Sequence, residues 1–78
     1  MPVNKRLLRR LVELGELFER GVAPVSIPLT QEELAQLAGT TRPTANRVLR
    51  SLEEEGIVAI ERGRIAIVDV AGLSRKAR

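Results

Sequence analysis

The side chains best suited to binding chemistry are grouped in a short stretch, residues 41–50. If this stretch is helical, apolar residues fall on one face and hydrogen-bonding residues on the other. The apolar face holds Ala45, Val48, Leu49 and, one turn later, Leu52, and the opposite face holds Arg42, Asn46, Arg47 and Arg50. Guanidinium groups are always charged and present a rigid fork of N–H donors. The stretch therefore has groups for hydrogen bonding and none for breaking covalent bonds.

Catalysis is not expected from this composition. The chain of 78 residues contains no Cys and no His, which excludes thiolate or imidazole zinc sites and His-dependent catalysis. No nucleophile is paired with a base, and no Gly-rich phosphate loop is present. Glu53, Glu54 and Glu55 are consecutive, so they point in different directions around a helix and do not form a carboxylate pair. We expect no enzyme activity, no metal and no cofactor.

Composition also narrows the class of partner. The formal net charge is +3 and the sequence pI is near 10.6. Phe18 is the only aromatic residue, so the stacking platforms of single-strand and RNA-binding folds cannot be built, whereas duplex recognition needs none. No run approaches the roughly 20 apolar residues of a membrane span, and the N-terminus lacks the apolar block of a signal peptide. We expect one soluble, cytoplasmic domain over residues 1–78 that contacts no membrane.

Residues 30–55 predict a helix-turn-helix. Thr30 and Glu33 have the spacing of a capping box, so a helix should begin at Gln31 and end at Gly39. Its apolar stripe is formed by Leu34, Leu37 and Ala38. Thr41 is then the cap of a second helix, in whose first turn Pro43 is tolerated.

The spacing of small and apolar residues within this segment is typical of a DNA-binding helix-turn-helix. The residues concerned are Gln31, Ala35, Gly39, Ala45 and Val48. An alternative remains open, because two short amphipathic helices joined by a Gly turn also occur as plain packing units in all-α domains.

Residues 1–20 predict a scaffold helix. Its apolar face is formed by Leu7, Leu11, Leu14 and Phe18, and it is widened by Leu8 and Leu17. Its basic residues are Lys5, Arg6, Arg9 and Arg10. They form either a solvated face with incidental Glu/Arg pairs or a phosphate contact near the N-terminal end.

The remaining segments predict a short sheet and a tail. Residues 25–29 form a short edge strand, because Pro24 and Pro28 flank it. Residues 57–68 form a hairpin that turns at Arg62 and Gly63. In residues 69–78, Asp69 caps one helical turn and the last five residues form the least ordered part. This order of elements is a winged helix, mainly α with a small β-sheet (α+β), in which the hairpin is the wing. Its arginines either touch a DNA backbone or only keep an exposed turn soluble.

The run LTQEELAQLAGTTRPTANRVLRSLEEEGIV, within residues 29–58, resembles the C-terminal DNA-binding domain of the cyclic-AMP receptor/fumarate-nitrate regulator (Crp/Fnr) family of bacterial transcription regulators. The resemblance implies sequence-specific binding of double-stranded DNA, with the second helix, residues 42–55, in the major groove. It implies base contacts from Arg42 and Arg47, to which we add Asn46 and Arg50 because they lie on the same polar face. It implies phosphate contacts from Thr41 and Thr44 and a hairpin that flanks the groove, and we expect further phosphate contacts from Thr30, Arg62 and Arg64.

Two departures from the family bear on these expectations. Pro43 stands where many members have a Glu that accepts a hydrogen bond from a base, so the operator is expected to differ from the best-known half-site. Asn46 stands at a position that is often small, where it supplies either the missing base contact or a phosphate contact. The effector-binding β-barrel and long dimerisation helix of the family are not found in these residues, so we expect a domain excised from a longer regulator.

The resemblance also implies partners for that longer regulator. It would bind a palindromic operator as a homodimer and work with RNA polymerase, whereas the isolated domain is expected to be monomeric. The rival interpretation is a winged helix used for protein contacts within a larger assembly.

Overall fold

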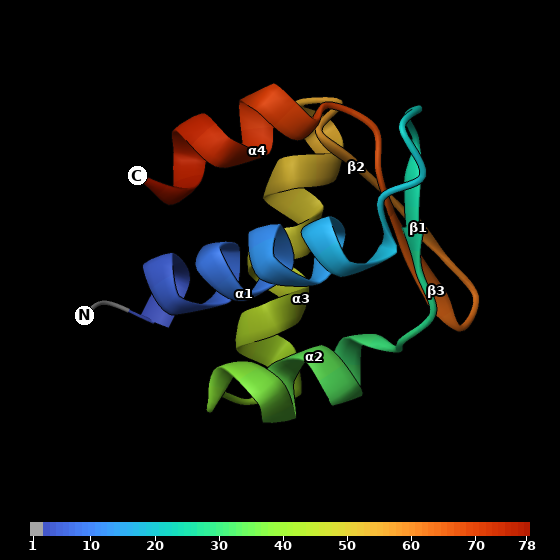
Figure 1. Cartoon of the computed structure of the whole chain (residues 1–78). Coiled ribbons are helices and arrows are strands. Elements are labelled where there is room, and N and C mark those ends of the chain that lie inside the picture. The colour runs from blue at the N-terminus through green and yellow to red at the C-terminus, as the bar shows by residue number, and fades with distance from the viewer. Residues whose placement is uncertain (1–2) are drawn as a thin grey trace.

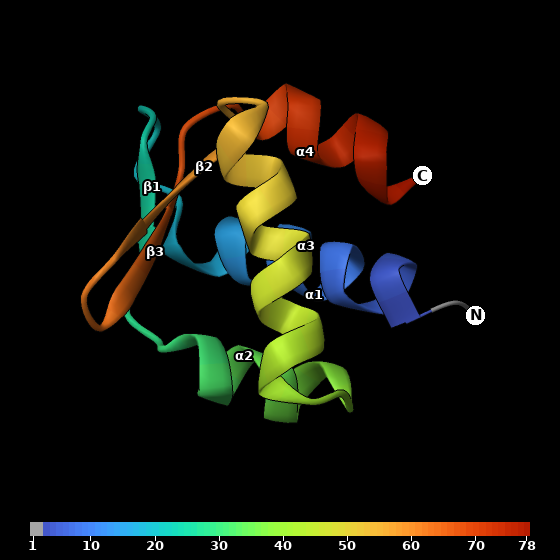
Figure 2. The same ribbon diagram turned by 180° about the vertical axis from the view of Figure 1, so that it is seen from behind.

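The computed structural model describes residues 3–78, which form four helices and a three-stranded antiparallel sheet. In chain order they are α1 (Val3–Phe18), β1 (Val25–Ile27), α2 (Gln31–Ala38), α3 (Arg42–Glu54), β2 (Val58–Glu61), β3 (Arg64–Ile67) and α4 (Val70–Ala77). Figure 1 shows α1 across the middle, between α4 and α2, with the sheet beyond its C-terminal end. α3 crosses behind α1 in that view and lies in front of it in Figure 2. The predicted α+β winged helix is confirmed.

α1 is held in place by apolar side chains at helical spacing. Leu7 and Leu11 are fully buried, and Phe18 packs partly buried against the same core. Leu17, which we expected to widen this face, is instead 77% exposed. Consecutive residues lie about 100° apart around a helix, so a helix that turns Phe18 towards the core turns Leu17 away from it. α1 ends at Phe18, before the expected end at Arg20.

The basic residues near the start of α1 bind backbone carbonyls of two other helices. Arg6 Nε donates to the carbonyl of Ala38 at the end of α2, at 3.2 Å. Arg9 Nε donates to the carbonyl of Ala77 at the end of α4, also at 3.2 Å, and Lys5 donates to a neighbouring carbonyl of α4. The last carbonyls of a helix lack intrahelical partners and carry partial negative charge. The contacts of Lys5, Arg6 and Arg9 therefore belong to neither of our interpretations. Arg10 fits the solvated face, because its Nη1 lies 3.2 Å from Glu13 Oε1 in an exposed i,i+3 pair.

α4 corrects the expected tail. Residues 74–77 continue the helix that Asp69 caps by accepting a hydrogen bond from Gly72 N at 2.9 Å. Leu73 and Ala77, one turn apart, are buried, and α4 packs mainly on α1. The segment is short of apolar residues, so its helical structure depends on this packing and on the caps supplied by α1.

The sheet contains the predicted hairpin and one further strand. β2 and β3 are joined by a two-residue turn at Arg62 and Gly63, and Gly63 has φ of 73°, a left-handed conformation that glycine adopts without strain. β1 pairs with the other edge of β3, which gives the order β1-β3-β2. β1 stops at Ile27, earlier than the expected residue 29, and the next residue, Pro28, has no N–H to donate to the ladder.

α1 comes very close to the sheet at Gly15. A Cβ placed on Gly15 would lie 2.8 Å from Ile67 Cδ1. Ile67 is 1% exposed, and in the sheet it is paired with Val25 on β1 and Val58 on β2. The missing side chain at position 15 thus lets α1 pack directly against the central strand. No helix within residues 3–78 has the length and apolar character needed to cross a bilayer.

Candidate nucleic-acid interface

α2 begins and ends as predicted. Glu33 N donates to Thr30 Oγ1 at 3.1 Å, and Thr30 N donates to Glu33 Oε1 at 2.8 Å, which completes the capping box. Gly39 follows with φ of 69°, and the N–H of Thr40 donates to the carbonyl of Ala35 at 2.9 Å. The chain therefore turns sharply, and three residues separate the end of α2 from the start of α3.

The start of α3 combines two hydroxyl groups with a proline. Thr44 N donates to Thr41 Oγ1 at 3.4 Å, and Thr41 Oγ1 donates to Thr44 Oγ1 at 3.1 Å. Pro43 lies in the first turn, where its missing N–H removes no intrahelical bond. The other first-turn N–H groups have no partner within the helix. This end of α3 thus presents hydroxyls, N–H donors and partial positive charge at the surface.

α2 and α3 pack through a small apolar surface. It consists of Leu34, Ala35 and Ala38 from α2 and of Ala45, Leu49 and Leu52 from α3. Leu37, expected in the buried stripe, is 49% exposed. Leu37 and Ala35 lie on opposite sides of the stripe that Leu34 and Ala38 form, and only the side with Ala35 is buried. Val48 is only partly buried. The packing fixes α3 with its arginines on the outer side.

The three arginines of α3 are all exposed, but they differ in their partners. Arg50 Nη1 lies 3.3 Å from Glu53 Oε1 in an ion pair. Arg47 Nη2 donates to Thr44 Oγ1 at 3.4 Å, close to the limit for a hydrogen bond. Within residues 3–78, neither Arg42 nor Arg47 forms an ion pair. These two guanidinium groups keep their charge and most of their donors for an external acceptor.

Arg42 borders a polar hollow where α2, α3 and the hairpin meet. The hollow has a volume of about 280 Å³ and is lined by Thr30, Gln31, Glu32, Arg42, Glu61, Arg62 and Gly63. Three residues that the sequence assigned to the site, Thr30, Arg42 and Arg62, therefore come together from three separate elements.

The hairpin carries the two remaining arginines of the predicted site. Glu61 and Arg64 are direct cross-strand partners, and Arg64 Nε lies 2.9 Å from Glu61 Oε1. Arg62, in the exposed turn, forms no ion pair with any other described residue. The tip of the wing therefore presents one unpaired cation beside a neutralised pair.

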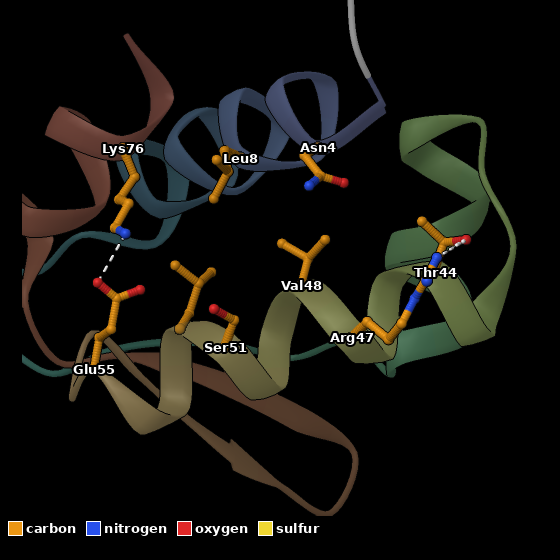
Figure 3. Close-up of a pocket in the computed structure, with 9 residues that line it drawn as sticks. Asn4, Leu8, Thr44, Arg47, Val48, Ser51, Glu55 and Lys76 are labelled. Carbon is orange, nitrogen blue, oxygen red and sulfur yellow. Dashed lines mark hydrogen bonds and ion pairs between the residues drawn. The ribbon is translucent and has the colours of Figure 1, made fainter.

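A second hollow, of about 400 Å³, runs along the side of α3 that faces α1 and α4 (Figure 3). Arg47 and Thr44 lie at one end of it, and the ion pair between Lys76 Nζ and Glu55 Oε1, at 2.8 Å, lies at the other. In the described part of the chain no polar side chain is buried and no cluster of His, Cys, Asp or Glu could hold a metal. The hollow continues the exposed surface around Arg47, and the residues that line it include no set of groups arranged for catalysis.

Asn46 has a partner that the sequence did not indicate. Its Nδ2 donates to Gln31 Oε1 at 2.7 Å, which joins α3 to the first residue of α2. Both side chains are half-buried. In the sequence, Gln31 entered only as part of the helix-turn-helix spacing, and no local pattern links two residues that are fifteen positions apart. Gln31 therefore belongs to the candidate interface, where sequence analysis did not place it.

Two helices packed through a buried apolar surface, exposed arginines on the second helix and a flanking hairpin define the class of the protein as a winged helix-turn-helix domain. Known proteins narrow the class further. The family model described as the Crp-like helix-turn-helix domain matches residues 5–76. The chain belongs to this family, as the resemblance in residues 29–58 implied.

Individual relatives agree with this assignment. A CRP-like cAMP-activated global transcriptional regulator from Mycobacterium tuberculosis is 37% identical over 79 residues, covering 97% of this chain and 35% of the relative. A cyclic AMP receptor protein from Thermus thermophilus is 40% identical over 58 residues, covering 74% of this chain and 26% of the relative. The crystal structure of a CRP/FNR-family transcriptional regulator from Thermus thermophilus matches with a TM-score of 0.85 and 30% identity, over 99% of this chain and 41% of that one. These similarities support sequence-specific DNA binding by a bacterial regulator, and the similar proteins are regulators and not enzymes.

Proposed function

We propose that this domain reads double-stranded DNA by placing the N-terminal half of α3 in the major groove. The observation that carries the proposal is the pair of arginines in the first half of α3: Arg42 and Arg47 are exposed and have no ion pair within residues 3–78, while the inner face of the same helix is buried. An arginine fork bonds to O6 and N7 of guanine at the same time. Two such residues on a helix that is fixed by its core can therefore distinguish base pairs.

Four side chains of α3 are proposed as base contacts: Arg42, Asn46, Arg47 and Arg50. Arg50 is paired with Glu53, but both side chains are substantially exposed, and exposed ion pairs contribute only about 0.2–1 kcal/mol. Arg50 can therefore exchange Glu53 for a base at little cost. Asn46 Nδ2 already donates one hydrogen bond to Gln31 Oε1, so Asn46 Oδ1 and the second N–H of Nδ2 are left for a base.

Five further residues are proposed as phosphate contacts: Thr30, Thr41, Thr44, Arg62 and Arg64. The three threonines lie at or near the N-terminal ends of α2 and α3, where partial positive charge and N–H groups favour an anion. The two arginines lie on the hairpin beside them. Phosphate contacts of this kind fix the register of a protein on the duplex, while base contacts supply specificity.

The domain is further proposed to act within a longer, non-enzymatic regulator. The chain spans 35% of the length of the first curated relative that it matches. A homodimer of the longer protein would place two copies of α3 on the two halves of a palindromic operator. Such a regulator would act in the cytoplasm, where the bacterial chromosome and RNA polymerase, its proposed further partner, are found.

Selection of bound sequences from random duplex DNA tests this proposal. The wild-type domain should enrich one half-site, and its affinity should fall steeply with salt, because each neutralised phosphate releases close to one counterion. The double variant Arg42→Ala/Arg47→Ala should enrich none. Arg20→Ala/Arg75→Ala is the matched control, since it also removes two exposed arginines, both outside the helix-turn-helix. No enrichment and a flat salt response in the wild type would refute the proposal and favour a protein-contact module, for which the exposed Leu17 would be the first candidate surface.

A further inference from the structure

The hydrogen bond between Asn46 and Gln31 ties the middle of the exposed row on α3 to α2. At 2.7 Å it is at the short end of the range for N–H···O bonds in proteins, about 2.7–3.2 Å. Both side chains are half-buried, so neither rotates as freely as an exposed amide. Gln31 is the first residue of α2, directly after its cap Thr30. The bond therefore joins the two helices at the edge of the proposed DNA surface.

Asn46 is flanked on its own helix by two arginines. Arg42 lies four residues before it and Arg50 four residues after it, so the three side chains follow one another along one side of α3. Arginine can only donate hydrogen bonds, whereas an amide also accepts them. Asn46 Oδ1 is therefore the one acceptor in this row. Pro43, in the same helix, cannot supply another from its side chain.

An amide reads adenine with one edge. Oδ1 accepts from the amino group N6, and the N–H on the same side of Nδ2 donates to N7. The second N–H of Nδ2 points away from that edge and takes no part in base reading. An acceptor on α2 can hold this second N–H and leave the reading edge intact. This acceptor would also keep the amide from rotating by 180°. Such a rotation would exchange Oδ1 with Nδ2 and remove the preference for adenine.

We propose that Gln31 is a positioning residue for base reading: by holding Nδ2 of Asn46, it sets a preference for adenine at one base pair of each half-site. This inference rests on the proposed function, in which α3 enters the major groove. Gln31 itself touches no base. Its acceptor oxygen turns Asn46 Oδ1 towards the groove, between Arg42 and Arg50.

The test compares the affinity of the domain for duplexes that carry each of the four base pairs at the position whose preference is lost in Asn46→Ala. The wild type should prefer adenine there by about 5- to 150-fold, the range of one good bidentate base contact. Gln31→Met keeps the length of the side chain but has no acceptor, and it should reduce this preference to about twofold or less. Adding Gln31→Met to Asn46→Ala should cause no further loss, because the two residues act through one contact.

Gln31→Glu is the rescue control. Its carboxylate still accepts from Nδ2, so the preference for adenine should persist even though the added negative charge weakens binding to every duplex. Thermal melting of each variant shows that it is folded, and Gln31→Ser gives a second variant whose side chain is too short to reach Asn46. A merely structural role of Gln31 would lower the melting temperature and leave the base preference unchanged.

The inference is overturned if Gln31→Met and Gln31→Ser keep the adenine preference, or if they weaken all duplexes equally, as the loss of a phosphate contact would. It is also overturned if the wild type prefers a base other than adenine at the position whose preference is lost in Asn46→Ala. A wild-type domain that selects no sequence would remove the proposed function together with this inference. Selection that depends on Arg47 but not on Gln31 would remove this inference alone.

Discussion

Replacement of Arg47 by alanine should lower affinity for the selected operator about tenfold to a hundredfold and leave non-specific binding nearly unchanged. The magnitude follows from what Arg47 must give up when it binds. Its one hydrogen bond within the described chain is the 3.4 Å contact with Thr44 Oγ1, and no ion pair restrains it. A bidentate contact with guanine contributes about 1–3 kcal/mol, and nearly all of this free energy should be lost from the binding of the operator when Arg47 is removed.

Arg50→Ala is the matched control for Arg47→Ala. It removes the same charge from the same helix, but Arg50 must first leave Glu53, 3.3 Å away. An exposed ion pair of this kind contributes about 0.2–1 kcal/mol, so the loss for Arg50→Ala should be smaller by up to about fivefold. Glu53→Gln should release Arg50 and strengthen binding.

Fluorescence anisotropy on labelled duplexes measures both effects. Each variant is titrated with the selected operator and with a duplex of the same composition in scrambled order, at one fixed salt concentration. Thermal melting verifies that the variants remain folded. Equal weakening on the two duplexes would show that Arg47 contacts phosphate, and the assignment of the reading face of α3 would be wrong.

Three further predictions concern the core, the wing and the assembly. Leu49→Ala should destabilise the domain by about 2–5 kcal/mol in chemical denaturation, since Leu49 is fully buried, whereas the half-exposed Leu37→Ala should cost under about 1 kcal/mol. Similar losses for the two variants would contradict the assigned core. Arg62→Ala should weaken binding to all sequences alike and reduce the salt slope by about 1, and a change in base preference would argue against a phosphate contact. The 78-residue chain should be monomeric by light scattering; a tight dimer would contradict this and would point to the exposed Leu17.

Features with a local cause could be predicted from the sequence. The capping box of Thr30 and Glu33 and the hairpin turn at Gly63 depend on residues that are near one another in the chain, and both are present. From such signals the order of the helices and strands could be predicted. Burial at the edge of a helical face was harder to predict, since Leu17 and Leu37 fit the apolar spacing but face away from the neighbouring elements.

Features with a distant cause could not be predicted. The second half of α4 is helical because Leu73 and Ala77 pack on α1 and because Arg9, far away in the sequence, binds its final turn. Arg6 binds the end of α2 in the same way. The bond from Asn46 to Gln31 likewise joins two helices whose relative placement only the folded chain defines. The exposed polar face of α3 was thus recognisable in the sequence, but the contacts that orient its side chains were not.

The close approach of α1 to the sheet has a consequence for attempts to make this domain more robust. Exchanging a glycine within a helix for alanine usually adds about 0.5–1 kcal/mol of stability, because alanine loses less backbone entropy on folding. At Gly15 the added methyl group would lie 2.8 Å from Ile67 Cδ1, so this end of the Ile67 side chain would have to turn into the hollow of about 70 Å³ that Gly15 and Ile67 line together. The usual gain in stability from alanine is therefore offset at this position by the rearrangement of a core side chain. Substitutions on the exposed surface of α1 carry no such cost, because they displace no core side chain.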